Sequence, residues 1–221
     1  MHKTIGKTTK DILSLKVMTF TLMIGISSIL IWVAILWSYW EEFEGLVTSY
    51  LSWVPWEWAK DTVAYISAPL VGYSMIIITI SILTSIFSEY LLISLAKKHY
   101  PEHDKIYSVS IISSIVVTIK SIGLFIVLFI VLFPFTFIPI LGQVLMLYIW
   151  SILLKAPTVH DVGGLFIEDK KILKKRDKKS TLIAMMASLF NYIPILNIFA
   201  PIYAQIMFLH HILGYPSSSK S

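Results

Sequence analysis

The sequence predicts an all-α integral membrane protein with two full transmembrane helices and two proline-broken helical hairpins that are only partly inserted. Its composition is the first observation, because 57% of the 221 residues are hydrophobic and only 14% are charged, outside the range of soluble globular domains. The second is a set of uncharged runs that reach the roughly 20 residues needed to cross about 30 Å of hydrocarbon. The third is a short phrase that occurs twice, each time with a proline inside an apolar run.

The repeated phrase is Ile-Pro-Ile-Leu, which lies within Phe135–Gly142 and again within Phe190–Asn197. Each copy belongs to an apolar run that is too long for one membrane helix, and proline cannot continue the hydrogen bonds of a helix. A helix that breaks at bilayer depth leaves backbone groups without partners, and lipid cannot supply them. We therefore expect function to reside at these two turns.

Two long apolar runs, residues 17–40 and 64–96, predict the full transmembrane helices. The first follows a basic N-terminus, but it is longer than the roughly 7–15-residue core of a signal peptide and lacks a cleavage site, so we expect it to remain attached. The loop between them, residues 41–63, is acidic, and the region from Trp37 to Trp58 holds five of the seven tryptophans. This favours an aromatic belt with a short amphipathic piece on the membrane surface; the alternative is a loop packed on its own aromatic side chains.

Positive charge predicts the orientation, because cytoplasmic loops carry an excess of Lys and Arg. The N-terminus (residues 1–16) and the loops 97–105 and 155–179 are basic, and they are expected in the cytoplasm. The acidic loop 41–63 is expected in the periplasm. The chain, residues 1–221, is expected to form a single membrane domain.

Residues 106–154 and 180–213 predict the two hairpins. The first begins and ends on the cytoplasmic side, so it forms either two thin crossings or a hairpin that penetrates part-way. The second is too long for one straight helix and too short for two full crossings, which favours a half-depth hairpin that turns near Pro194. The alternative is one tilted, proline-kinked crossing that places the C-terminus outside.

The basic region, residues 155–179, is expected to form an amphipathic helix on the cytoplasmic surface. Leu165, Phe166, Ile172 and Leu173 share one face at helical spacing, and charged residues fill the rest. Because such a helix lies in the interface and its cations attract acidic headgroups, residues 165–179 are expected to contact anionic lipids.

Sequence motifs of enzymes are missing, including a glycine-rich phosphate loop, His-Glu-x-x-His and Gly-x-Ser-x-Gly. We therefore expect no enzyme activity, no cofactor and no nucleic-acid partner. His99 and His103 are separated by Pro101, and His210 and His211 are adjacent and point in different directions. No metal site is expected, and the absence of cysteine excludes thiol chemistry and disulfides.

Two ionisable residues, Lys120 and Glu89, lie within apolar runs, where a charge is costly. Lys120 either extends to the interface or faces a wet cavity that attracts an anion; Glu89 either faces neighbouring helices or carries a proton. A half-helix that starts in mid-membrane would add the positive end of its dipole to such a pathway. The candidate residues for lining or shaping an anion pathway are therefore Lys120 and Glu89, together with Gly142, Pro194 and Asn197.

The C-terminal stretch Phe190–Ile202 resembles the signature of the CysZ-type sulfate permeases, which share a domain with the etoposide-induced membrane proteins of eukaryotes. The order of features is also similar over nearly the whole chain: basic start, long helix, acidic loop, long helix, hairpin, basic segment and second hairpin. The resemblance implies two full membrane helices with two partly inserted hairpins, assembled as dimers or larger homo-oligomers.

The resemblance also implies sulfate uptake for cysteine biosynthesis across a bacterial inner membrane. Sulfate binding in the family involves a Gly-Leu-Arg motif at the start of the first membrane helix, and the matching residues here are Ser14, Leu15 and Lys16. Lysine keeps the charge of arginine but lacks its bidentate fork, which suits a tetrahedral oxyanion.

Two functional hypotheses follow from the sequence. The first is a multi-pass anion permease for sulfate or a similar oxyanion, working either as a passive channel or with a coupled proton. The second is a membrane scaffold or assembly factor that holds a partner or anionic lipid through the basic region.

Overall fold

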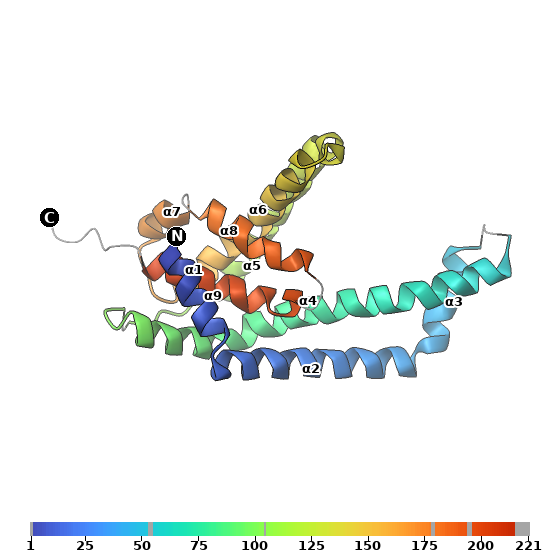
Figure 1. Cartoon of the computed structure of the whole chain (residues 1–221), viewed down its shortest axis with the longest axis horizontal. Coiled ribbons are helices and arrows are strands. Elements are labelled where there is room, and N and C mark those ends of the chain that lie inside the picture. Colours follow the sequence, from blue (N-terminus) through green and yellow to red (C-terminus); the bar gives the residue numbers. More distant parts are fainter. Residues whose placement is uncertain (1, 53–54, 104, 178–179, 194–195, 215–221) are drawn as a thin grey trace. The chain divides into compact units, whose positions relative to one another are not determined.

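The computed structural model describes residues 2–52, 55–103, 105–177, 180–193 and 196–214 (Figure 1). The described residues form helices and short connections, with no strand among them. Pro194, a predicted pathway residue, lies outside the described part. The chain divides into two compact units: a smaller unit of residues 19–86, and a larger unit made of residues 1–18 together with 87–221.

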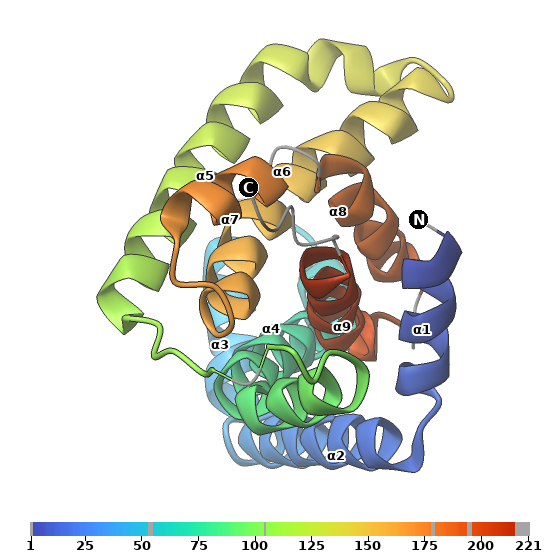
Figure 2. The same ribbon diagram turned by 90° about the vertical axis from the view of Figure 1, so that its left-hand side faces the viewer.

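Helix α9 (Ala200–Leu213) is the centre of the larger unit, because eleven of its fourteen residues are buried. Figure 2 shows α9 nearly end-on, with α1 (His2–Ile12) on one side and α8 (Thr181–Ser188) and α6 (Leu141–Gly164) nearby. The sequence of α9 explains this position, since it holds no Asp, Glu, Lys or Arg and its apolar side chains surround the axis.

The α5–α6 hairpin forms the longest pair of arms in the larger unit. Helix α5 (Ile111–Leu132) continues into the 3-10 turn η1 (Phe133–Phe137), and α6 runs back to Gly164 with Pro157 inside it. Both arms are long and apolar enough to cross a membrane.

The second apolar segment reverses direction between Tyr192 and Ala200. Helix α8 is followed by the 3-10 turns η2 (Leu189–Tyr192) and η3 (Leu196–Ile198) and then by α9. Arg176, just before α8, donates a hydrogen bond to the carbonyl oxygen of Ile212 near the end of α9. The start of α8 therefore lies near the end of α9, which is the arrangement expected of the predicted hairpin. At 1.5 Å per residue, the 14 residues of α9 cover only about 21 Å.

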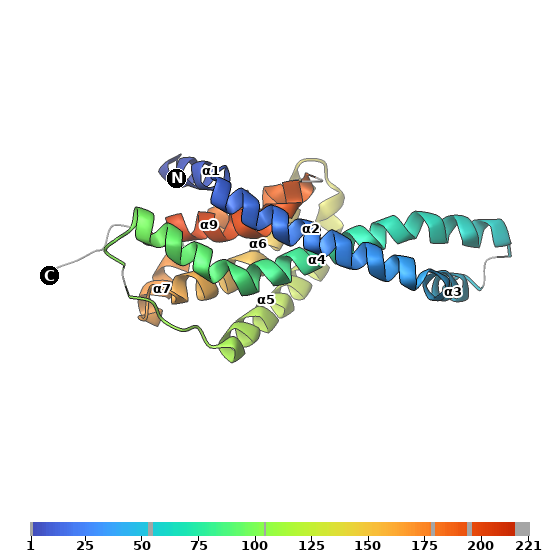
Figure 3. The same cartoon turned by 90° about the horizontal axis from the view of Figure 1, so that it is seen from below.

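The smaller unit contains most of α2 (Leu15–Ser38), all of α3 (Trp40–Tyr50) and the first part of α4 (Glu57–His99) (Figure 3). The Trp32 indole donates a hydrogen bond to the Thr79 hydroxyl at 2.8 Å. Further along, a Cβ on Gly72 would lie 2.8 Å from a Leu36 methyl carbon. These contacts pair α2 with α4 in antiparallel fashion.

Helices α2 and α4 correspond to the two predicted transmembrane helices, and both are long and apolar enough to cross a membrane. Together with the two arms of the first hairpin they make four candidate spans among the described residues. The predicted surface piece in the acidic loop corresponds to α3, whose residues include none that are buried.

The basic region differs from the single amphipathic helix that the sequence predicts. Helix α6 extends to Gly164, beyond the expected hairpin end at residue 154, and the next helix, α7 (Lys170–Asp177), is short. Leu165 and Phe166 lie in the turn between them and are buried. The chain turns because the backbone N–H groups of Phe166 and Ile167 bond to the carbonyl of Gly163. The predicted apolar face is thus divided, and part of it belongs to the protein core.

The first copy of the repeated phrase forms a tight turn that requires glycine. Ile140 has a φ of 66°, which is uncommon for a β-branched residue, and the N–H of Gly142 donates to the carbonyl of Ile138 at 2.7 Å. A Cβ on Gly142 would overlap the carbonyl oxygen of Thr136.

Replacing Gly142 with alanine should therefore destabilise the fold by about 1–3 kcal/mol, because the added methyl group meets rigid backbone. Thermal unfolding of the purified protein in detergent measures the effect. Gly123→Ala is the matched control, since Gly123 lies in α5 with open space around it and alanine favours helix. Equal unfolding midpoints for the two variants would contradict this account of the turn.

Candidate functional site

A cavity of about 480 Å³ lies within the larger unit, lined by residues of α5, α6, α7 and α8. Its wall is mostly apolar, but two lysines, Lys120 from α5 and Lys155 from α6, belong to it. The complete lining is Val117, Lys120, Ser121, Leu124, Leu128, Tyr148, Ser151, Ile152, Lys155, Ala156, Asp177 and Thr181. Two ammonium groups in a largely apolar cavity favour an anionic ligand.

The Lys155 side chain is held by two neighbours. Its Nζ donates to the Thr181 hydroxyl at 3.3 Å and lies 3.7 Å from an Asp177 carboxylate oxygen. That oxygen of Asp177 is buried and accepts no hydrogen bond from the described residues. Because a carboxylate repels an anion, Asp177 competes with any anionic ligand for Lys155.

The serines of the cavity face it from buried positions on α5 and α6. The Ser121 hydroxyl donates to the carbonyl of Val117 at 3.0 Å, and the Ser151 hydroxyl donates to the carbonyl of Tyr148 at 2.6 Å. Both bonds are the local kind that serine makes inside a helix. The strongest donors available to a ligand are thus the two lysines.

Of the predicted pathway residues that the structure describes, only Lys120 lines this cavity. Gly142 lies in the α5–α6 turn, and Asn197 is buried in η3. Glu89 is exposed on α4. Lys155 was not among the predicted pathway residues because the sequence places it at the edge of a charge-rich region, which is typical of a solvated surface.

The predicted anion-binding residues lie at the junction of α1 and α2. The Ser14 hydroxyl donates to the carbonyl of Asp11 at 2.6 Å, and Leu15 is 83% exposed. Lys16 donates to the Ser94 hydroxyl at 2.7 Å, and its Nζ lies 4.9 Å from the ring centroid of Tyr90. None of the three residues lines the cavity.

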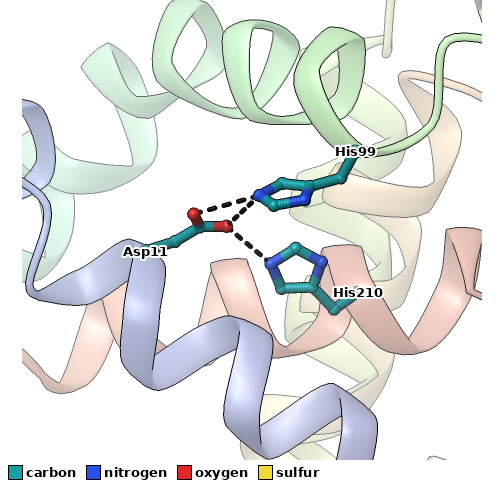
Figure 4. A group of neighbouring side chains, drawn as sticks. All are labelled: Asp11, His99 and His210. Atoms are coloured by element: carbon teal, nitrogen blue, oxygen red, sulfur yellow. Dashed lines mark hydrogen bonds and ion pairs between the residues drawn. The ribbon is translucent and has the colours of Figure 1, made fainter.

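A second polar cluster joins Asp11 of α1, His99 of α4 and His210 of α9 (Figure 4). The Asp11 side chain is 1% exposed, and its carboxylate oxygens lie 2.8 Å from His99 Nε2 and 2.9 Å from His210 Nε2. The ammonium of Lys98, which is 57% exposed, approaches the same carboxylate at 3.3 Å. The Tyr100 hydroxyl lies 3.1 Å from the other ring nitrogen of His210.

Burial and these contacts set the protonation of the cluster. Burial alone would raise the pKa of Asp11, but the hydrogen bonds and charges of His99 and His210 outweigh it and hold that pKa below its ordinary value. Burial lowers the pKa of His210 to about 4 against the opposing pull of Asp11. Burial, with the nearby charges of Asp11 and Glu102, raises the pKa of Tyr100 to about 12. At neutral pH the cluster thus holds an ionised Asp11, a neutral His210 and a protonated Tyr100.

Local sequence spacing does not reveal this cluster. Its members come from three helices that are far apart in the chain, whereas the sequence pairs His99 with His103 and His210 with His211. The only local signal is Asp11 itself, an acidic residue within the basic N-terminal segment.

A comparison with family models matches residues 4–201 to the family described as sulfate transporter CysZ/etoposide-induced protein 2.4. No curated protein and no solved structure is significantly similar to the chain. The match includes α1, the α2–α4 helices, the first hairpin, the basic region and the turn of the second hairpin. With its four long apolar helices, this multi-pass membrane protein therefore belongs to the sulfate transporter CysZ/etoposide-induced protein 2.4 family.

Proposed function

We propose that the protein is an inner-membrane anion permease that takes up sulfate for cysteine biosynthesis. The observation that carries the proposal is the cavity of about 480 Å³ that contains Lys120 and Lys155, in a chain of the sulfate transporter type. An oxyanion that leaves water loses hydration, and paired ammonium groups in an apolar setting offset much of that loss. The cavity suits an oxyanion better than a cation or an apolar molecule.

Ser14, Leu15 and Lys16 are proposed to form an anion site on the cytoplasmic side, where the uptake route ends. Lys16 is exposed, and its bond to the Ser94 hydroxyl is with a neutral partner, so its charge is available to an incoming anion. Gly142, Pro194 and Asn197 are proposed to shape the two turns, and the permease is proposed to work as a homo-oligomer.

Lys120→Ala and Lys155→Ala should each reduce sulfate flux at least about tenfold, because each removes one of the two cationic donors of the cavity. The measurement is uptake of radiolabelled sulfate into liposomes that contain the purified protein. Lys105→Ala is the matched control, since Lys105 is exposed and outside the cavity. Wild-type flux no greater than that of empty vesicles would refute the proposed function.

Asp177→Asn should strengthen sulfate binding, by about threefold or more, because it removes the carboxylate that competes for Lys155. Equilibrium binding of labelled sulfate to the detergent-purified protein measures the change. Glu168→Gln changes the net charge equally at an exposed position outside the cavity and should leave the affinity unaltered. An equal gain in both variants would assign the effect to overall charge.

A second candidate function, a scaffold that holds anionic lipid or a partner, is favoured by the exposed cations of α7. Its exposed lysines are Lys170, Lys171, Lys174 and Lys175. All four belong to the predicted basic region.

Growth of a bacterium that lacks sulfate uptake separates the two functions. On low sulfate, with a cysteine-fed control, a permease predicts that Lys120→Ala abolishes rescue while neutralising the four α7 lysines has little effect. A scaffold predicts that neutralising the four α7 lysines abolishes rescue while Lys120→Ala has little effect, because its function requires the basic surface and not the cavity.

A further inference from the structure

We propose that Asp11, His99 and His210 form a binding site for a transition-metal dication, with Zn²⁺ as the best match. The three side chains come from α1, α4 and α9, and one ligand atom from each lies within 4.8 Å of the other two. Figure 4 shows a nitrogen of each imidazole ring directed at the same carboxylate. This site is separate from the lysine-lined cavity, and it does not depend on the proposed transport of sulfate.

The distances fit a small ion after a slight outward movement of the ligands. The Oδ2 atom of Asp11 is 2.8 Å from His99 Nε2 and 2.9 Å from His210 Nε2. Zinc takes nitrogen ligands at about 2.0–2.1 Å and carboxylate oxygen at about 2.0–2.2 Å. Ligand atoms in a tetrahedron of that size lie roughly 3.3 Å apart, so the two Asp11–histidine pairs need to open by only a few tenths of an ångström.

The hydrogen bonds around His210 provide the outer support that metal-binding histidines require. The Tyr100 hydroxyl lies 3.1 Å from His210 Nδ1, and it donates to the His210 backbone carbonyl at 3.4 Å. With its own hydrogen directed at that carbonyl, the Tyr100 oxygen can accept the Nδ1–H of His210. In the metal-bound form, the Nε2 lone pair of His210 would bind the ion and replace the hydrogen bond that Nε2–H donates to Asp11 without metal.

The proposed metal site is buried, and the neighbouring ammonium group of Lys98 can move away from it. The side chains of Asp11 and His210 are 1% and 0% exposed, so a cation there meets little competition from water. The ammonium of Lys98 neutralises Asp11 at 3.3 Å, but its side chain is 57% exposed and can move into solvent. A bound dication would take over that neutralising role.

The donor set favours a transition metal over calcium or magnesium. Two imidazoles and one carboxylate suit zinc, iron, nickel or copper, whereas Ca²⁺ and Mg²⁺ prefer oxygen ligands. Three protein ligands leave a position for water or an anion. A bound ion would also connect the ends of α1, α4 and α9 within the larger unit.

The test uses the full-length protein, purified without a histidine tag and stripped of metal with a chelator. Titration with Zn²⁺ by calorimetry should show one ion per chain, and titration with Co²⁺ should give the visible absorption of a tetrahedral nitrogen-and-oxygen site. His99→Gln should weaken Zn²⁺ binding at least about a hundredfold. Tyr100→Phe, which retains all three ligands, should weaken it by about ten- to a hundredfold.

His103→Gln is the matched control, because His103 is close in sequence to His99 and belongs to no described metal cluster. Its Zn²⁺ affinity should equal that of the wild type. Thermal unfolding in the absence of metal reports whether each variant is folded. The proposal is overturned if the wild type binds no stoichiometric Zn²⁺, or if His99→Gln and His103→Gln bind it alike. Wild-type titration alone decides the matter if His99→Gln does not fold.

Discussion

The buried carboxylate of Asp11 constrains the larger unit more than any other single group that the structure describes. An ionised carboxylate that is 1% exposed requires partners, and this one finds them on two other helices, α4 and α9. Removing one partner of such a buried pair generally costs about 3–5 kcal/mol. His210, one of those partners, follows the fully buried Met207, Phe208 and Leu209 along α9. The position of α1 is therefore linked directly to the packing of the core.

The lysine-lined cavity differs from the Asp11 cluster in its balance of charge. Its charges are not cancelled in a closed network, because Lys155 shares only a distant contact with Asp177 and a hydrogen bond with Thr181. Lys120 adds a second positive charge in the same apolar wall. The Asp11 cluster thus balances its charge internally, whereas the cavity retains an excess of positive charge, which is the condition for holding an anion.

Much of the fold could be predicted from the sequence, because long uncharged runs leave few alternatives to membrane helices. Helices α2 and α4 and the two reversals follow from run length and charge placement. The turn at Gly142 follows from proline and glycine chemistry. Lys120 was also identifiable, since a lone charge in an apolar run requires a reason.

Other features depended on tertiary contacts that no local pattern contains. The basic region is divided because Leu165 and Phe166 are buried against the larger unit, although their spacing also fits one amphipathic face. Lys155 reaches the cavity because α6 continues beyond the predicted hairpin end at residue 154. The cluster of Asp11, His99 and His210 arises only when α1 and α9 meet at the end of α4.

The length of α4 bears on where Glu89 lies relative to the hydrocarbon layer. The apolar part of α4 before Glu89, from residue 64, contains about 25 residues and spans about 38 Å at 1.5 Å per residue. A hydrocarbon layer of about 30 Å is already covered by that stretch, and the excess length produces hydrophobic mismatch. Glu89 can then mark the boundary where the bilayer ends, and its charge need not enter hydrocarbon. An acidic residue placed at that boundary would contact water, and in that position it would not need to carry a proton.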